Sequence, residues 1–450
     1  MLKCKIFVPY GAVGLDCSEE AFAAGLAMKP DIISSDAGST DSGPYYLGSG
    51  NGKYATTAVK RDLKRMILGA DSLGIPMTIG SAGTCGSNFG VDEAARICEE
   101  ICRENGLHKK IAKIYAQQDR ELIKRKYREG KVHALEGAPE ISEKTFDECS
   151  TIVALSGAEP FQKALREGAD IVICGRATDT AVIAAYPLMK GCDEASCWHA
   201  AKVAECGGLC TSAGLSGCAF IEIDEKGFNV RSVMPGSTVS EYSVAAHLLY
   251  ENADPVYLKE PGVCIDTTSS KYTAVSPTNV RVEGTKVTHM PYTMKLEGAG
   301  PVGFQTISIV GIRDRKIMKD PMAWVNAVRQ QGIAKLDKTG ILSETYSLNF
   351  KVFGYNAVSG MPVPEGYVPN EIGVVLTVTA DTQALATQVA KAFNPLLLHL
   401  NIFPERQMPS FAFISSPAEI EKGSIYEFKL YHVVSIDDPL ELVKISFTEV

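Results

Sequence analysis

Short apolar runs alternate with amphipathic segments along the first 190 residues of the chain. In the amphipathic segment at residues 57–73, Val59, Leu63, Met66 and Ile67 recur at the spacing of one helical face. Such alternation predicts strands that are each followed by a helix, which is the arrangement of a parallel sheet. The predicted strands are residues 5–9, 31–35, 75–79, 111–115, 151–155 and 170–174, and further helices are predicted at residues 18–28 and 92–105.

Polar, glycine-rich loops follow four of these predicted strands. They cover residues 36–44, 80–88, 156–160 and 175–179. In open α/β sheets, ligands bind beyond the carboxyl ends of the strands, so we expect these loops to meet at one site. A helix that begins in such a loop offers unpaired backbone N–H groups and the positive end of its dipole. The pattern therefore favours an anionic ligand, either a carboxylate or a phosphate.

After residue 218 the pattern changes to alternating strands with Gly and Pro turns, and it changes again after residue 342. The order of strand, helix and strands in the last hundred residues is typical of a ferredoxin-like layer. The predicted fold class is α/β, with a Rossmann-like N-terminal part in which helices flank a parallel sheet. We expect three domains: an α/β domain at 1–218, a β-rich α+β region at 219–342 and a ferredoxin-like α+β domain at 343–450.

Bulk composition narrows the class of protein. The chain has 450 residues, of which 45% are apolar and 22% are charged, as expected for a multidomain globular protein. Its net charge is −8, and its longest basic run, residues 124–128, fits one solvated helix face. We therefore expect no nucleic-acid partner, because a nucleic-acid surface needs a broad positive field.

No stretch reaches the roughly 18 apolar residues that a membrane helix needs, and no secretory signal is evident at the start. The thirteen cysteines are scattered, without the spacing of a disulfide framework. We accordingly predict a cytoplasmic protein with reduced thiols and no membrane partner.

The loop at residues 36–44 holds two carboxylates, Asp36 and Asp41, as candidate general bases. Its oxygens can equally bind a divalent cation, or its polar side chains can simply satisfy the backbone of a turn. The candidate substrate-binding residues of this loop are Gly38, Ser39, Thr40 and Ser42.

The loop at residues 80–88 contains neither of the usual glycine-rich nucleotide motifs, so we do not expect NAD or FAD. Its backbone N–H groups can still hold an anion. The candidate binding residues here are Ser81, Gly83, Ser87 and Asn88.

In the loop at residues 175–179, Gly175, Arg176 and Asp179 are candidate binding residues. The planar guanidinium of Arg176 suits a carboxylate or phosphate, although it can instead pair with Asp179 at the start of a helix. Glu205, beside two glycines, is a third candidate acid or base.

Two sets of residues have partial metal-ligand character. His199, Glu205, Cys206 and Cys210 lack the paired spacing of a structural zinc site. His247 and Glu251 have a metal-competent spacing that is more often an exposed helical pair. Which metal is bound, if any, stays open.

Several motifs together resemble the acyclic terpene utilisation (AtuA) family. They are DAGSTDSGP at 36–44, GRATD at 175–179, AECG at 204–207, HLLYE at 247–251 and DPVYL at 254–258. The tail from about residue 344, with YEFKLYHVV at 426–434, resembles the ferredoxin-like domain attached to some members. The resemblance spans nearly the whole chain. The chain departs from the form of terpene-degrading members, in which a His stands just ahead of the Glu-Cys pair; here that stretch is Lys202-Val203-Ala204.

The resemblance implies catabolism of a branched acid through its CoA thioester, by lyase, hydro-lyase or isomerase chemistry. Two alternatives stay open: a metal-assisted hydrolase that uses Asp36 and Asp41, and a non-catalytic subunit that binds an acid or a partner enzyme. We expect a small anionic substrate and a homo-oligomer, with or without a small partner subunit.

Overall fold

The computed structural model describes residues 2–249, 254–403 and 411–450. The chain forms two compact units, one made of Met1–Gly300 with Phe428–Val450 and the other of Pro301–Glu427. Each unit combines helices with a mixed or antiparallel sheet, so the chain belongs to the α/β class.

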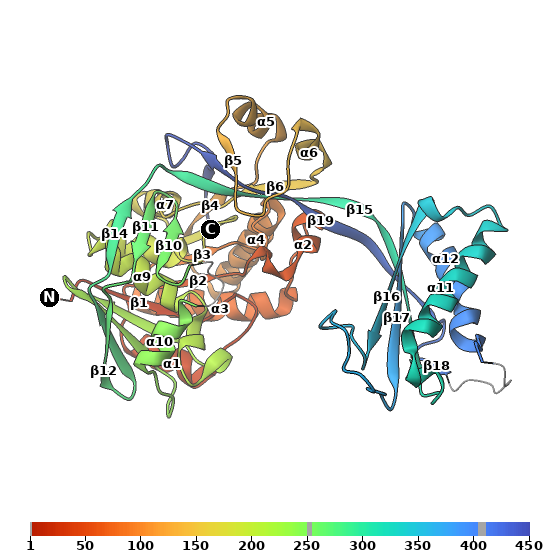
Figure 1. Cartoon of the computed structure of the whole chain (residues 1–450). Helices are drawn as coiled ribbons and strands as arrows, with labels where there is room; N and C mark the ends of the chain where they lie inside the picture. Colours follow the sequence, from red (N-terminus) through yellow and green to blue (C-terminus); the bar gives the residue numbers. More distant parts are fainter. Residues whose placement is uncertain (1, 250–253, 404–410) are drawn as a thin grey trace. The chain divides into compact units, whose positions relative to one another are not determined.

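The first unit is built on a ten-stranded mixed sheet (Figure 1). Five neighbouring strands at its centre, β1-β2-β3-β7-β4, are parallel, and antiparallel strands extend the sheet on both sides. In sheet order the strands are β12 (Lys271–Ser276), β13 (Asn279–Glu283), β9 (Gly227–Ser232), β8 (Ala219–Ile223), β1 (Cys4–Val8), β2 (Ile32–Asp36), β3 (Met77–Gly80), β7 (Ile171–Cys174), β4 (Lys110–Tyr115) and β20 (Lys444–Glu449).

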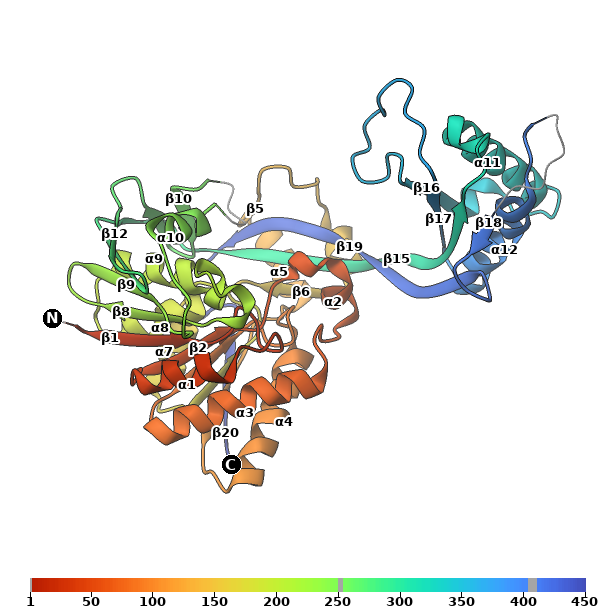
Figure 2. The same ribbon diagram turned by 90° about the horizontal axis from the view of Figure 1, so that it is seen from below.

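Helices cover both faces of the parallel strands. On one face α1 (Glu19–Ala27), α3 (Thr56–Leu73) and α4 (Asn88–Asn105) pack on a core that includes Phe7, Ile33 and Ile79. Figure 2 shows α3 and α4 side by side. On the other face α7 (Glu159–Arg166), α8 (Ala181–Met189) and α9 (Glu194–Ala204) bury residues such as Ile6 and Val172. A strand that is buried on both faces must be apolar throughout, which explains the continuous apolar runs in the sequence.

Smaller elements complete the first unit. Residues 241–289 include the short helix α10 (Glu241–His247) and a three-stranded antiparallel sheet. A hydrophobic cluster around Phe146 and Leu296 joins α5 and α6 to β6 and the first half of β15. The remaining elements are α2 (Pro44–Ser49), α5 (Arg120–Arg128), β5 (Val132–Ala134), α6 (Glu143–Glu148), β6 (Thr151–Ala154), β10 (Tyr257–Glu260), β11 (Val263–Asp266) and β14 (Lys286–His289).

The second unit packs two helices, α11 (Pro321–Asp337) and α12 (Gln383–His399), against an antiparallel sheet. Its sheet contains β16 (Tyr346–Phe353), β17 (Ile372–Ala380) and the second half of β15 (Thr293–Ile312), with β18 (Phe411–Phe413) on β15. The strand β19 (Glu419–Ser435) begins in this unit and ends in the first. The buried aromatic residues Trp324 and Phe393 fill the core between helices and sheet.

Most predicted elements occur within one or two residues of their predicted bounds. Ser18 caps α1 by accepting a hydrogen bond from the Ala21 backbone at 3.0 Å, and Gly106 ends α4 in the left-handed conformation. One predicted strand, however, is not part of the parallel sheet, because β6 pairs antiparallel with β15.

The compact units do not follow the predicted boundaries at 218 and 342. Strand β8 pairs with β1 over five residues, so residues after 218 extend the same sheet. At the other end, β20 pairs with β4, so the last residues of the chain return to the first unit instead of completing a domain at 343–450. The local pattern of apolar and polar residues does not reveal pairings between strands that are so distant in sequence.

Within the described ranges no helix is long and apolar enough to cross a membrane. No disulfide joins any of the thirteen cysteines, all of which lie in those ranges, and eleven of them are buried. Most of the cysteines are therefore small core residues, as predicted.

Candidate functional site

Asp36, the last residue of β2, is held inside the first unit at the carboxyl end of the parallel strands. Its side chain is 1% exposed, and its Oδ2 atom accepts a 2.7 Å hydrogen bond from the backbone of Gly38. The turn requires a φ of +109° at Gly38, which favours glycine. Among the described residues, no donor pairs with the Oδ1 atom, which lies against Gly80 of the neighbouring strand. Asp36 is therefore a buried carboxyl in which one of the two oxygen atoms accepts no hydrogen bond from the described residues.

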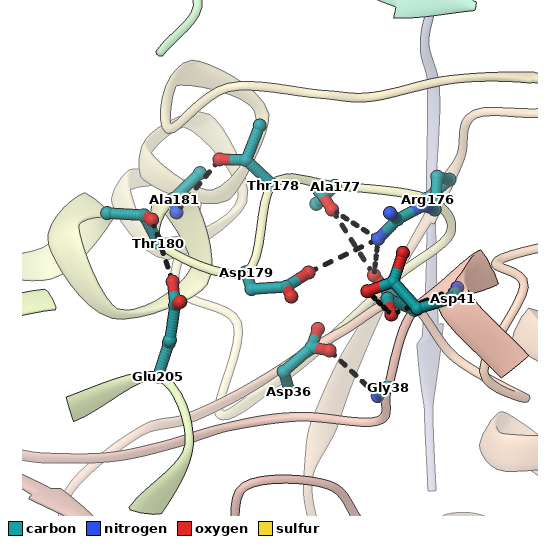
Figure 3. Close-up of polar contacts among 12 residues, drawn as sticks. Asp36, Gly38, Asp41, Arg176, Ala177, Thr178, Asp179, Thr180, Ala181 and Glu205 are labelled. Atoms are coloured by element: carbon teal, nitrogen blue, oxygen red, sulfur yellow. Dashed lines mark hydrogen bonds and ion pairs between the residues drawn. The ribbon is translucent and has the colours of Figure 1, made fainter. Parts of the chain in front are cut away.

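Arg176 lies opposite, in the loop that follows β7. Its guanidinium is buried and donates to Ser81 Oγ and to the backbone oxygen of Ala177, both at 3.0 Å, and to Asp179 Oδ1 at 3.2 Å (Figure 3). It also pairs with Glu297 on β15, with 3.0 Å between Nε and Oε2. The predicted pairing of Arg176 with Asp179 is thus present, while its contact with a ligand stays a prediction.

Sequence reasoning missed Glu297, which is 3% exposed and lies near the start of β15. Burial raises the pKa of this carboxyl, but the charges of Arg176 and Lys295 outweigh burial and lower it to about 2. Glu297 is therefore ionised, and it neutralises Arg176. A lone glutamate within the apolar run of β15 was the one available signal.

Asp179 faces Asp36 across the site, and Figure 3 shows both carboxyls turned toward the same space. Burial and the neighbouring charge of Asp179 raise the pKa of Asp36 well above its usual value, against the opposing effect of Arg176. Burial likewise raises the pKa of Asp179, despite Arg176 and Lys202. The Asp179 side chain is 27% exposed to solvent, so the site is open to solvent there. Two like charges in one buried site favour retention of a proton by the pair.

Glu205 lies beyond Asp179, at the end of α9. It is 2% exposed, its Oε1 atom pairs with Lys202 Nζ at 2.6 Å, and its Oε2 atom accepts from Thr180 at 3.0 Å (Figure 3). Burial raises the pKa of Glu205 to about 8, with Lys202 acting in the opposite direction. Glu260, another residue that sequence reasoning missed, also has a raised pKa because of burial. Lys202, Asp179 and Glu260 all affect Glu205, so these groups form one electrostatic cluster.

The remaining residues of the first loop lie at the edge of this cluster. Asp41 is exposed and accepts a 2.7 Å hydrogen bond from Ser39, although its charge contributes to the raised pKa of Asp179. Ser42 accepts from Lys53 at 2.8 Å, and Thr40 is buried. The structure therefore places Asp41 nearer to solvent than Asp36.

The loop after β3 divides between two places. Ser81 joins the Arg176 network, whereas Gly83 lines a cavity of about 160 Å³ between α3 and α4. This cavity is mostly apolar and is also lined by Ala37, Tyr54 and Thr84. Burial and the charge of Asp36 raise the pKa of Tyr54, which places the cavity beside the carboxylate cluster.

Three other predicted binding residues have structural partners. Ser87 caps α4 by accepting from Gly90 at 3.2 Å, and the backbone of Asn88 donates to Gln117 at 3.0 Å. Gly175 packs tightly against Gly86 and Ala116, where a side chain would clash. None of these contacts tests whether the residues bind a ligand.

The two predicted metal-ligand sets are rearranged in the structure. The buried His199 ring contacts Thr285 at 2.7 Å and Tyr272 at 3.3 Å. Among the described residues, the one group of metal-competent side chains is Glu205, Cys206 and His247, whose ligand atoms lie within 4.8 Å of one another. Glu251, the predicted partner of His247, lies outside the described residues.

Comparison with known proteins identifies a family for the chain. A family model described as acyclic terpene utilisation family protein AtuA matches residues 49–408, which include the loops after β3 and β7 and the Glu205 segment. Searches of curated proteins and of solved structures returned no match. The match covers far more than half of the chain, so the chain belongs to the acyclic terpene utilisation family AtuA.

Proposed function

We propose that this protein is a catabolic enzyme that acts on a small carboxylic acid or its CoA thioester by acid/base catalysis. The reaction class that fits is a lyase, a hydro-lyase or an isomerase. Membership of the AtuA family supports a catabolic role. The observation that carries the proposal is the buried pair Asp36 and Asp179 beside Arg176, in which both carboxyls have a raised pKa.

Acid/base catalysis is most effective when the pKa of the catalytic group lies near the working pH. An ordinary aspartate is fully ionised at neutral pH, so it is a weak base and cannot act as an acid. Burial and a like charge move Asp36 toward neutrality, as in other carboxyl pairs that share a proton. Asp36, Asp41 and Glu205 stay the candidate proton carriers, and the geometry favours Asp36.

The surroundings of the pair suit an acyl substrate. Loop amides near Gly38, Gly83 and Gly175, together with Arg176, are our candidates for holding the carboxylate or thioester carbonyl. The mostly apolar cavity beside Tyr54 offers space for a short hydrocarbon chain. We propose no NAD or FAD, because neither nucleotide motif occurs in the sequence.

Two features support the finer fold assignments that we propose. Parallel strands with helices on both faces support a Rossmann-like first unit. In the second unit the chain order β15-α11-β16-β17-α12-β19 is that of a ferredoxin-like fold, and the strands lie in the order β16-β17-β15-β19.

Hydrogen exchange in heavy water tests the proposed chemistry without knowledge of the net reaction. The purified protein is incubated in D₂O with short di- and tricarboxylic acids and with acyl-CoA thioesters, and deuterium in the recovered compounds is measured by mass spectrometry. We expect one compound class to gain deuterium next to its carbonyl, and we expect Asp36→Asn to abolish the gain.

The matched control is Asp62→Asn, which changes another fully buried aspartate, one on α3 outside the cluster. This variant should retain exchange if it remains folded. Exchange that is equally fast in wild type and Asp36→Asn would contradict the assignment of Asp36.

A second candidate function, a partner-dependent or non-catalytic subunit, is favoured by exposed apolar residues in the second unit. Val358 is 90% exposed and Met361 is 67% exposed, in the segment between β16 and β17. Exposed apolar side chains are typical of interaction surfaces when they form a patch. An oligomer that light scattering after gel filtration detects and that Val358→Asp and Met361→Asp dissociate would show that these residues form an interaction surface, as this candidate requires. An unchanged mass in both variants would argue against it.

A further inference from the structure

The side chains of Glu205, Cys206 and His247 converge inside the first unit. Their potential ligand atoms, a carboxylate oxygen, the thiol sulfur and an imidazole nitrogen, all lie within 4.8 Å of one another. Glu205 and His247 are buried, and Cys206 is partly exposed. The group therefore combines three different donor types at one point that solvent can reach through Cys206.

Two helix ends bring these residues together. Glu205 and Cys206 are consecutive and directly follow α9, whereas His247 is the last residue of α10. Ser240 fixes the start of α10 by a reciprocal capping box with Ser243. Because α10 is only seven residues long, the cap at its start also fixes the position of His247 at its end.

We propose that Glu205, Cys206 and His247 bind a zinc ion. Thiolate, imidazole and carboxylate are the three side-chain ligands that zinc takes in proteins. A tetrahedral ion with bonds of about 2.0–2.3 Å requires ligand atoms about 3.3–3.8 Å apart. Side-chain rotations that move the ligand atoms by about 1 Å would bring them to these distances. Three protein ligands leave a fourth position for water or substrate, which is the arrangement of catalytic zinc sites.

The neighbours of Glu205 suit a metal-binding carboxylate. Thr180 donates to its Oε2 atom at 3.0 Å and Lys202 to its Oε1 atom at 2.6 Å, so both oxygens are oriented before an ion arrives. Second-shell hydrogen bonds of this kind fix ligating carboxylates in known metal sites. The carboxylate retains lone pairs for the ion, because each oxygen can accept more than one interaction.

Further carboxyl groups lie near the proposed ligands. The acidic neighbours that act on Glu205 include Asp179 and Glu260. The nearby positive groups are Lys202 and Arg176. The Oε2 atom of Glu260 is buried, and no hydrogen-bond donor in the described part of the chain pairs with it. A divalent ion would be attracted to these carboxyl groups in their ionised form.

The zinc proposal goes beyond the proposed function and does not depend on it. If the ion is present, Glu205 is a ligand and does not carry the reacting proton, which leaves that role to Asp36 or Asp41. The two ideas are tested by different residues and by different measurements.

The test is the metal content of the purified full-length protein, measured by plasma mass spectrometry after incubation with zinc and removal of the unbound ion. We expect about one zinc per wild-type chain. We expect at least a tenfold weaker zinc affinity in Cys206→Ser and in His247→Asn, because each variant replaces a strong ligand. Circular dichroism establishes that each variant is folded.

Cys264→Ser is the matched control, since Cys264 is likewise a partly exposed cysteine that forms no disulfide, and its replacement should not affect zinc binding. Cobalt substitution gives a second readout, because a cobalt–thiolate absorption band should appear in wild type and be lost in Cys206→Ser. A wild-type protein that binds neither ion, or folded variants that bind zinc as tightly as wild type, would overturn the proposal. Either result would leave the D₂O exchange test of Asp36 unaffected.

Discussion

The buried charges around Arg176 define the candidate site at the level of single residues. The Arg176 guanidinium contacts Ser81, Ala177, Asp179 and Glu297. Glu297 is its buried counter-ion, and Asp179 lies at the more open side. A charge that is buried without its partner is far more costly than the pair itself. The cluster is therefore held in place by a pair that sequence reasoning found only in part.

Replacement of Glu297 by Gln should destabilise the protein by about 3 kcal/mol or more, because the Arg176 charge would stay buried without its partner. The free energy of unfolding in urea measures this loss. Glu93→Gln is the control: Glu93 pairs with Arg96 on the surface, where such a pair contributes at most about 1 kcal/mol. Equal losses of free energy of unfolding in the two variants would show that the buried Arg176–Glu297 pair contributes no more to stability than a surface pair.

His199 should make stability depend on pH. Burial lowers its pKa from 6.5 to about 3. Between these values the unfolded chain binds more protons than the folded one, so stability should fall as the pH is lowered, by about 2 kcal/mol from pH 6.5 to about pH 5. His199→Gln should remove this part of the slope in unfolding experiments, whereas His289→Gln, at an exposed histidine, should not. An unchanged slope in His199→Gln would contradict the expectation.

At the scale of elements, the candidate site depends on close contact between two loops. Gly86, in the loop after β3, packs directly on the backbone of Arg176, in the loop after β7. The sequence predicted both loops and their position at strand ends, because strand length and turn residues are local properties. It did not predict which residues of the two loops touch, because that depends on how the loops pack against each other in three dimensions.

Gly86→Ala should displace the Arg176 loop, because a β-carbon at Gly86 would overlap the Arg176 backbone nitrogen. Gly106→Ala is a close control, since φ is +66° at Gly86 and +65° at Gly106, where no atom lies within 4 Å of the added carbon. The control should lose about 1 kcal/mol from the left-handed conformation, and Gly86→Ala about 2 kcal/mol more. Urea unfolding compares them, and equal losses would contradict the loop contact.

At the scale of the whole chain, local patterns predicted the elements better than the units. The strands, the helices and the parallel arrangement near the N-terminus follow from periodicity and capping residues such as Ser18 and Gly106. The return of β20 to β4 and the pairing of β8 with β1 are contacts between distant segments. Asp36, Arg176 and Asp179 were predicted because they follow strands, whereas Glu297 and Glu260 come from segments more than 80 residues further along the chain.

Removal of residues 444–450 should destabilise the first unit, although these residues lie far from its other strands in sequence. Strand β20 covers the edge of β4, and its loss would expose the backbone of Lys110–Tyr115. Hydrogen–deuterium exchange should therefore become faster in β4, with little change in β16 and β17 of the second unit. Unchanged protection of β4 would contradict this pairing.

The central claim is that Asp36 and Asp179 retain a proton at neutral pH. Infrared spectroscopy of protein labelled with ¹³C-aspartate tests it directly, because a protonated carboxyl and a carboxylate absorb at different frequencies. At pH 7 we expect a protonated-carboxyl band in wild type that is clearly weaker in Asp36→Asn, because that variant removes the carboxyl whose pKa burial and the charge of Asp179 raise. A wild-type spectrum with carboxylate bands alone would contradict the account.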